Sequence, residues 1–175
     1  MLPNPLHPAI VHFPVVIAIL LPLGVIGALF AIRRGANTRR AWLLPMAAAI
    51  VLALSAWAAV QTGGSQSDRV QRVVLERAIE AHEEIAEAFF AGSVGVAVVA
   101  LVGLAGGTIG RVARILTGAG ALTLAGLVVV VGHSGGQLVY RDGAASAYTS
   151  QGTDTSIGAA TREATRERIG GERPR

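Results

Sequence analysis

The 175-residue sequence contains no cysteine and no lysine, and it is poor in charge. Without cysteine the chain has no residues for disulfides, thiolate metal sites, cysteine-ligated iron–sulfur clusters or covalent c-type haem attachment. Without lysine, its net charge of +4 comes wholly from arginine. The arginines cluster in short loops and form no extended basic surface, so nucleic-acid binding is a poor explanation of the charge.

Only 15% of the residues are charged, whereas 52% are hydrophobic. Soluble domains have about a quarter of their residues charged, so we expect an integral membrane protein in contact with the lipid bilayer. Four apolar runs are each long enough for a transmembrane helix, which needs about 20 residues. The sequence therefore predicts an all-α, four-helix membrane bundle within residues 1–143, followed by a mostly disordered tail, 144–175. The expected helices span about 8–32, 41–60, 68–105 and 115–140.

The arginine-rich loops predict the orientation of the bundle. Residues 33–40 read RRGANTRR, and the turn at 106–114 contains two arginines and no acid. Because basic loops remain on the cytoplasmic side, both termini are expected on the outer, periplasmic side of a bacterial inner membrane. No positive charge precedes the first apolar run, which indicates a retained anchor and not a cleaved signal. Trp42 and Trp57 are expected to mark the inner and outer ends of the second helix.

The third helix is predicted to be amphipathic before it enters the membrane. Its charged residues recur at spacings of three and four, which places them on one stripe: Arg69, Arg72, Glu76, Glu80, Glu83 and Glu87. The opposite stripe is formed by Leu75, Ala78, His82, Ile85 and Phe89. We therefore expect His82 to point into the bundle and one of its ring nitrogens to find an oxygen partner.

All four histidines are expected near the outer surface. His7 and His12 lie at the outer start of the first helix, and His82 lies just before the third membrane segment. His133 is 19 residues beyond Arg114, hence roughly 28 Å along the fourth helix. An ionisable residue in an apolar run normally faces a bundle interior or a cavity, so His133 is expected to face inward.

Imidazole chemistry indicates what these residues bind. Neutral imidazole is a good ligand for iron, copper and zinc, and two rings from facing helices can take both axial positions of a b-type haem. We expect His133 to be one haem ligand, with His82 or His12 as the other, and His7 to be a mobile loop residue. The same four histidines, His7 included, are candidates for copper or zinc. The alternative to haem or metal binding is that these are core or loop histidines that bind no ligand.

The glycines beside His133 have two readings. Gly132, Gly135 and Gly136 either let helix backbones approach one another or leave room for a flat macrocycle. Other chemistries lack a signature, because no His-Glu-x-x-His pair and no Gly-x-Ser-x-Gly elbow occurs, and GTIGRVARILTG lacks the Lys-Ser/Thr of a phosphate loop. Residues 41–60 and 115–131 contain no ionisable group, which disfavours a proton relay or the transport of a charged solute.

Three motifs resemble a known family. They are His7-Pro8-x-x-x-His12-Phe13-Pro14, His82 before the third membrane segment, and Gly132-His133-x-Gly135-Gly136-x-Leu138-Val139-Tyr140. Together with four helices, they resemble the bacterial predicted membrane proteins of domain of unknown function 2231, over about residues 1–143. Members of that family occur joined or adjacent to c-type cytochrome or Rieske-like modules. The resemblance thus implies electron transfer with an exported cytochrome or Rieske-type partner.

The leading functional expectation is a small b-type haem-binding membrane protein that relays electrons near the outer surface. Such a chain is more readily an electron-transfer or accessory subunit than a stand-alone enzyme. The alternatives are a non-catalytic structural subunit of an oligomer or larger membrane complex, favoured by the many small residues, and a copper- or zinc-binding membrane protein.

Overall fold

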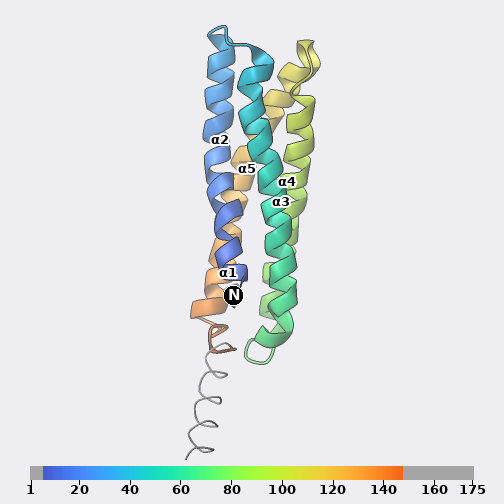
Figure 1. Cartoon of the computed structure of the whole chain (residues 1–175). Helices are drawn as coiled ribbons and strands as arrows, with labels where there is room; N and C mark the ends of the chain where they lie inside the picture. Colours follow the sequence, from blue (N-terminus) through green and yellow to red (C-terminus); the bar gives the residue numbers. More distant parts are fainter. Residues whose placement is uncertain (1–5, 148–175) are drawn as a thin grey trace, which may run out of the picture.

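The computed structural model describes residues 6–147, which form five α-helices (Figure 1). These helices are α1 His7–Ile10, α2 His12–Arg33, α3 Thr38–Val70, α4 Glu76–Val102 and α5 Gly107–Tyr140. α1 is a single turn that leads into α2, and the four long helices run up and down as an antiparallel bundle. The predicted all-α fold is confirmed, because the described residues contain no strand.

The two ends of the bundle differ in composition. The loops that join α2 to α3 and α4 to α5 lie at one end, which we call the arginine end (Figure 1, top). The other end holds α1, the turn between α3 and α4, and the C-terminus of α5 (Figure 1, bottom). We call it the histidine end, because it carries all four histidines.

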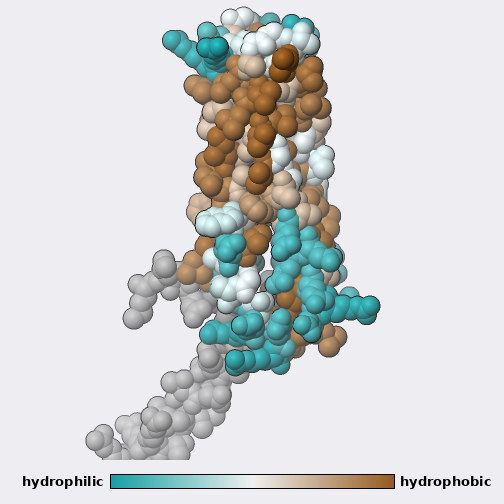
Figure 2. Space-filling view, turned by 90° about the vertical axis from the view of Figure 1, so that its right-hand side faces the viewer, coloured by the Kyte–Doolittle hydropathy of each residue, from teal (hydrophilic) through white to brown (hydrophobic). Residues whose placement is uncertain are grey.

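A belt of large apolar side chains surrounds the bundle between these ends. All four long helices are long and apolar enough to cross a membrane. Figure 2 shows this apolar belt with hydrophilic residues above and below it, the lower ones reaching farther along one side. Exposed members of the belt include Leu23, Leu44, Leu54, Ile115 and Leu122. Such a surface is suited to contact with lipid tails.

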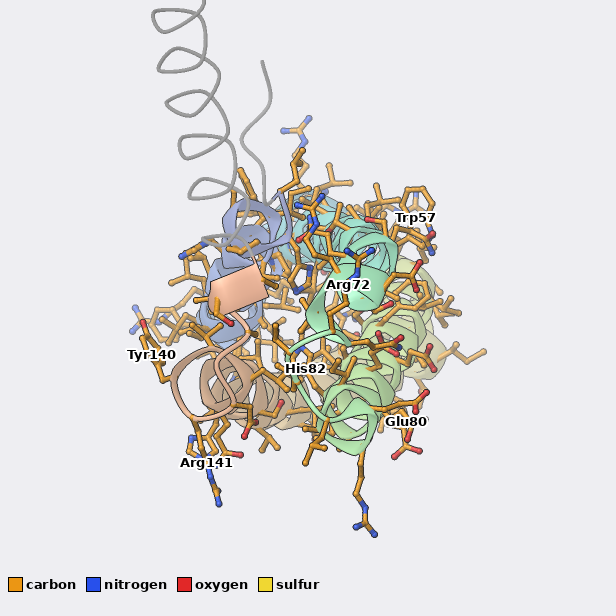
Figure 3. All side chains as sticks on the ribbon, turned by 90° about the horizontal axis from the view of Figure 1, so that it is seen from below. Trp57, Arg72, Glu80, His82, Tyr140 and Arg141 are labelled. Atoms are coloured by element: carbon orange, nitrogen blue, oxygen red, sulfur yellow. The ribbon has the colours of Figure 1, made fainter. Side chains whose placement is uncertain are left out.

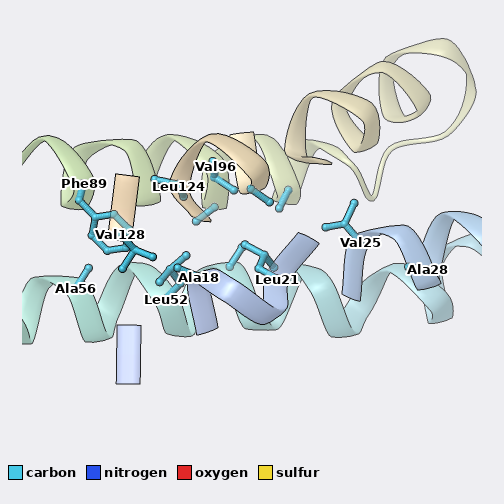
Figure 4. Close-up of a cluster of buried hydrophobic side chains, with 14 of the residues drawn as sticks. Ala18, Leu21, Val25, Ala28, Leu52, Ala56, Phe89, Val96, Leu124 and Val128 are labelled. Atoms are coloured by element: carbon cyan, nitrogen blue, oxygen red, sulfur yellow. The ribbon is translucent and has the colours of Figure 1, made fainter. Parts of the chain in front are cut away.

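The interior, by contrast, is built largely from small residues. Buried alanines occur on every long helix: Ala18, Ala49, Ala56, Ala97, Ala100 and Ala121. Leu21, Leu52, Leu124 and Phe89 fill the space between them (Figure 4). Lipid tails are as apolar as leucine, so membrane helices associate through close packing, which small residues allow. Small residue size therefore distinguishes the interior of the bundle from its lipid-facing surface better than hydrophobicity does.

α1 and α2 are separated at Val11 because of a proline. Pro14 has no N–H to donate to the carbonyl of Ile10, so the hydrogen-bond ladder is interrupted there. The neighbouring bonds are intact, since the Val11 amide donates to His7 and the Val15 amide donates to Val11. The backbone at Val11 remains helical (φ −60°, ψ −22°), so α1 leads directly into α2.

At the arginine end, Trp42 is more deeply buried than the sequence predicts. Trp42 is fully buried, and its indole Nε1 donates to the carbonyl oxygen of Ala100 at 2.9 Å. The expected interfacial position of Trp42 is therefore wrong, whereas Trp57 is exposed. α5 begins at Gly107 and not near residue 115, so Arg111 and Arg114 belong to the helix.

Arg114 holds the C-terminus of α4 in place. Its side chain is only 7% exposed, and its guanidinium donates to the carbonyl oxygens of Gly103 and Ala105. Carbonyls at a helix C-terminus lack intrahelical donors and carry the negative end of the helix dipole, which suits a cation. Gly110 permits this close approach, because a Cβ at its position would lie 1.8 Å from the Ala105 carbonyl oxygen.

At the histidine end, α3 is longer and α4 shorter than predicted. The expected helices at 41–60 and 68–105 leave residues 61–67 as their connection, but α3 continues to Val70, and the turn occupies residues 71–75. Thr62, Ser65 and Ser67 each satisfy their hydroxyl by donating to a carbonyl one turn earlier in the same helix. These polar residues therefore remain helical. Leu75, expected on the packed stripe, precedes α4 and is 82% exposed.

The start of the expected tail packs on this end of the bundle. Ala144 forms a small apolar cluster with Val74 and Ile79. The predicted disorder of the rest of the tail lies outside the described residues.

Candidate functional site

The structure divides the four histidines into an inner pair and an outer pair. His7 on α1 and His82 on α4 are half-buried, whereas His12 on α2 and His133 on α5 are exposed. Figure 3, seen from the histidine end, shows His82 near the centre of the bundle and Glu80, Tyr140 and Arg141 at its periphery. The candidate site is therefore built around His7 and His82.

His7 is fixed against α3. Its Nδ1 lies 2.9 Å from the carbonyl oxygen of Ala59 and 3.3 Å from Oγ1 of Thr62. The ring also packs on the backbone of Gly63, where an added Cβ would lie 3.2 Å from its Cε1. The expectation that His7 is a mobile loop residue is thus wrong.

His82 is fixed against α5 in a closely similar way. Its Nδ1 lies 2.8 Å from Oγ of Ser134. Its Cε1 packs on Gly135, where an added Cβ would lie 3.2 Å away. The predicted inward direction and oxygen partner of His82 are both confirmed.

The hydrogen bonds determine which ring nitrogen carries the proton. The carbonyl oxygen of Ala59 can only accept, so in the neutral ring of His7 the proton is on Nδ1. The Ser134 hydroxyl donates its hydrogen to the carbonyl oxygen of Val131, at 2.9 Å. Its oxygen must therefore accept a hydrogen bond from Nδ1 of His82. Each neutral ring consequently carries a lone pair on Nε2.

These two lone pairs have no hydrogen-bonded neighbour within residues 6–147. The two rings are also near enough to each other to interact electrostatically. Metal-binding histidines show this pattern, in which one nitrogen donates to an oxygen and the other faces the metal. Within residues 6–147, each ring of the inner pair therefore has its Nδ1 held by an oxygen and its Nε2 without a protein partner.

His133 lies on the outward face of α5, contrary to the expected inward direction. An α-helix turns by about 100° per residue, so His133 is about 140° away from the buried Val128, whereas Gly135 is about 20° away. Nε2 of His133 accepts from the side-chain amide of Gln137 at 3.0 Å, on an exposed surface. His12 is likewise exposed beside the exposed Phe13. The structure does not bring either residue to the inner pair.

The glycines near His133 also separate into two kinds. Gly135 contacts the His82 ring, whereas added Cβ atoms at Gly132 and Gly136 would meet nothing within 4 Å. The helix-packing reading therefore does not hold for Gly132 and Gly136. Gly63, which the sequence did not single out, makes the same contact to His7 that Gly135 makes to His82.

Comparison with known proteins agrees with this architecture. The family described as "Predicted membrane protein (DUF2231)" matches residues 3–147 of the chain. The chain belongs to the DUF2231 family. No curated protein matches it, and no solved structure does so either. The resemblance drawn from the histidine and glycine motifs is thus confirmed.

The inner pair of this DUF2231 protein is short of ligands for a free metal ion. Nowhere in residues 6–147 do three His, Cys, Asp or Glu side chains come together in a group that could hold a metal. The buried polar side-chain atoms of the same region all have hydrogen-bond partners. The site therefore offers two imidazoles, and the buried polar side chains of the described region already have hydrogen-bond partners.

Proposed function

We propose that His7 and His82 hold a b-type haem at the histidine end of the bundle, and that the protein relays electrons there to an exported redox partner. The observation that carries this proposal is the pair of half-buried imidazoles whose Nδ1 atoms bond to oxygens and whose Nε2 atoms have no partner among residues 6–147. Haem iron in cytochromes takes axial ligands of this kind. Bundles build such sites from side chains on facing helices.

The donor set fits a haem better than a free zinc ion. Zinc sites usually draw three or four ligands from the protein, and the described residues supply no such group. A porphyrin brings four ring nitrogens, so two imidazoles complete the coordination of its iron. A copper ion bound by the same two rings is the competing reading.

The chain's own residues have defined tasks in this proposal. The Ala59 carbonyl and the Ser134 hydroxyl orient the rings, keep each proton on Nδ1 and make Nε2 a better donor. Gly63 and Gly135 let the rings sit close to α3 and α5. When bound, a haem supplies one-electron chemistry. The histidine end extends past the apolar belt, which favours access by a partner at the membrane surface (Figure 2).

The first test measures cofactor binding directly. Haem added to the purified full chain in detergent is expected to give a Soret band and a six-coordinate low-spin spectrum that saturates at one haem per chain. Failure to bind haem would overturn the proposal. In that case, elemental analysis that finds copper or zinc would support the metal alternative, and a chain without either would support a structural subunit.

The orientation of the bundle forms part of the same proposal. The arginine end carries six arginines and no acid, so we place it in the cytoplasm, with the histidine end outside the inner membrane. A reporter fused after Gly35 is expected to be cytoplasmic, and one fused after Gly143 external. The opposite pattern would exclude an exported redox partner.

A further inference from the structure

The arginine end contains a pocket that the histidine site does not explain. Its volume is about 670 Å³, within the range of about 300–1,000 Å³ that is usual for ligand sites. It opens between the loops that join α2 to α3 and α4 to α5. Four arginine side chains line it: Arg33, Arg39, Arg111 and Arg114.

The charge in this pocket has no counterpart in the described chain. All acidic residues of residues 6–147 lie toward the other end of the molecule: Asp68, Glu76, Glu80, Glu83, Glu84, Glu87 and Asp142. Arg114 is buried and bonds only to backbone carbonyls. Arg33, Arg39 and Arg111 are exposed, and no carboxylate of residues 6–147 lies near enough to pair with them. An anion in the pocket would therefore be attracted by several guanidinium groups at once.

The other residues that line the pocket indicate which kind of anion fits it. Apolar side chains form the part of the pocket that continues toward the belt: Leu29, Ile32, Leu104 and Ile115. Thr38 and Gly107, the first residues of α3 and α5, also line it. First-turn N–H groups of a helix lack intrahelical acceptors, and of those in α3 the N–H of Arg40 is taken by the side chain of Asn37. The pocket thus joins a phosphate-binding surface to an apolar one.

We propose that this pocket binds the phosphate head group of an anionic phospholipid, with Arg39 and Arg111 as its exposed ligands. Arginine binds phosphate oxygens through two parallel hydrogen bonds, and basic pockets between membrane helices recognise anionic head groups. The apolar lining accommodates the beginning of the acyl chains. A soluble phosphate ion would use the arginines and leave the apolar part of the pocket unfilled.

The test compares lipids that differ only in the head group. The full chain in detergent micelles is titrated with phosphatidylglycerol, with phosphatidylcholine of the same acyl chains, or with inorganic phosphate, and the thermal midpoint of unfolding is followed. We expect phosphatidylglycerol to bind at least about tenfold more tightly than either of the others. Equal effects of the two lipids would overturn the proposal. Equal effects of inorganic phosphate and phosphatidylglycerol would assign the pocket to a soluble anion instead.

Matched variants separate the pocket from general positive charge. Arg39→Gln with Arg111→Gln removes two arginines from the lining and should abolish the preference for phosphatidylglycerol. Arg34→Gln with Arg40→Gln removes the same charge from the same end, but neither residue lines the pocket, so the preference should persist. Equal losses in both double variants would show that only net charge matters and would overturn the proposed site. Arg114 is left unchanged, because it supports the end of α4.

Discussion

Replacing either His82 or His7 by alanine is expected to abolish the low-spin haem spectrum. Each change removes one of the two Nε2 donors, and the other helices present no third histidine to the inner pair. Loss of an axial ligand should weaken binding more than loss of an outer hydrogen bond, which costs about 10- to 100-fold. The measurement is a haem titration of each purified variant, followed by absorption spectroscopy.

The exposed histidines provide matched controls for this experiment. His133→Ala and His12→Ala remove the same side chain from the same end of the bundle, but neither residue contacts the inner pair in the structure. Both variants should retain the low-spin spectrum. Ser134→Ala should lie between the two groups, because it removes the acceptor for Nδ1 of His82 and leaves the ligand in place. A spectrum lost in His133→Ala and retained in His82→Ala would refute the assignment.

The largest effect on stability is expected from Gly110→Ala. Its Cβ would lie 1.8 Å from the carbonyl oxygen of Ala105 and 2.7 Å from the carbonyl carbon, both of which belong to the backbone. The loop must move to accept the methyl group, and the bonds from Arg114 to Gly103 and Ala105 would be disturbed. We expect a loss of about 3 kcal/mol in the free energy of unfolding. Reversible unfolding in mixed detergent micelles measures this change.

Gly106→Ala is the control for Gly110→Ala. Gly106 precedes α5 in the same loop, its φ is −78° and its ψ is 173°, and a Cβ there would meet nothing within 4 Å. Because alanine adopts this conformation readily, the change should be neutral or slightly stabilising, by less than about 1 kcal/mol. Equal destabilisation by the two alanines would show that backbone freedom, and not the contact with Ala105, governs this loop.

The two ends of the molecule support different functions. The histidine end carries the inner pair of imidazoles and all the acidic residues of the described chain, whereas the arginine end carries a basic pocket. Among residues 6–147, the only buried titratable side chain is Arg114, which belongs to the arginine end. We therefore expect the lipid-binding variants to leave the haem spectrum unchanged.

Several features follow from the sequence alone. The apolar runs determine four long helices, because each must satisfy its backbone hydrogen bonds internally in a bilayer. The placement of His82 follows as well, since it lies seven residues before Phe89 and thus on the same face of α4. Phe89 is buried, and His82, two turns earlier in α4, lies near the centre of the bundle (Figure 3). The spacing of the charged residues in the amphipathic segment predicted which face of the helix is packed.

The directions of the His133 and His7 side chains were determined by the tertiary structure. His133 lies in an apolar run in which both faces are hydrophobic, so depth alone suggested an inward side chain, although its angle from Val128 places it outside. His7 is held at the site by contacts with Ala59 and Gly63, which are 52 and 56 positions away in the chain. No local pattern predicts such a contact.

The burial of Trp42 could not be predicted from the sequence for the same reason, which is that both faces of a membrane helix are apolar. In water, hydrophobicity separates the core from the surface, but in a bilayer the outer face is also apolar. The sequence therefore determined that these helices cross the membrane, and it left open which side of each helix faces another helix. Packing decided this in the folded bundle, where alanines and a few leucines lie inside, Trp42 bonds to the Ala100 carbonyl, and large side chains such as Leu23, Leu44 and Leu122 face outward.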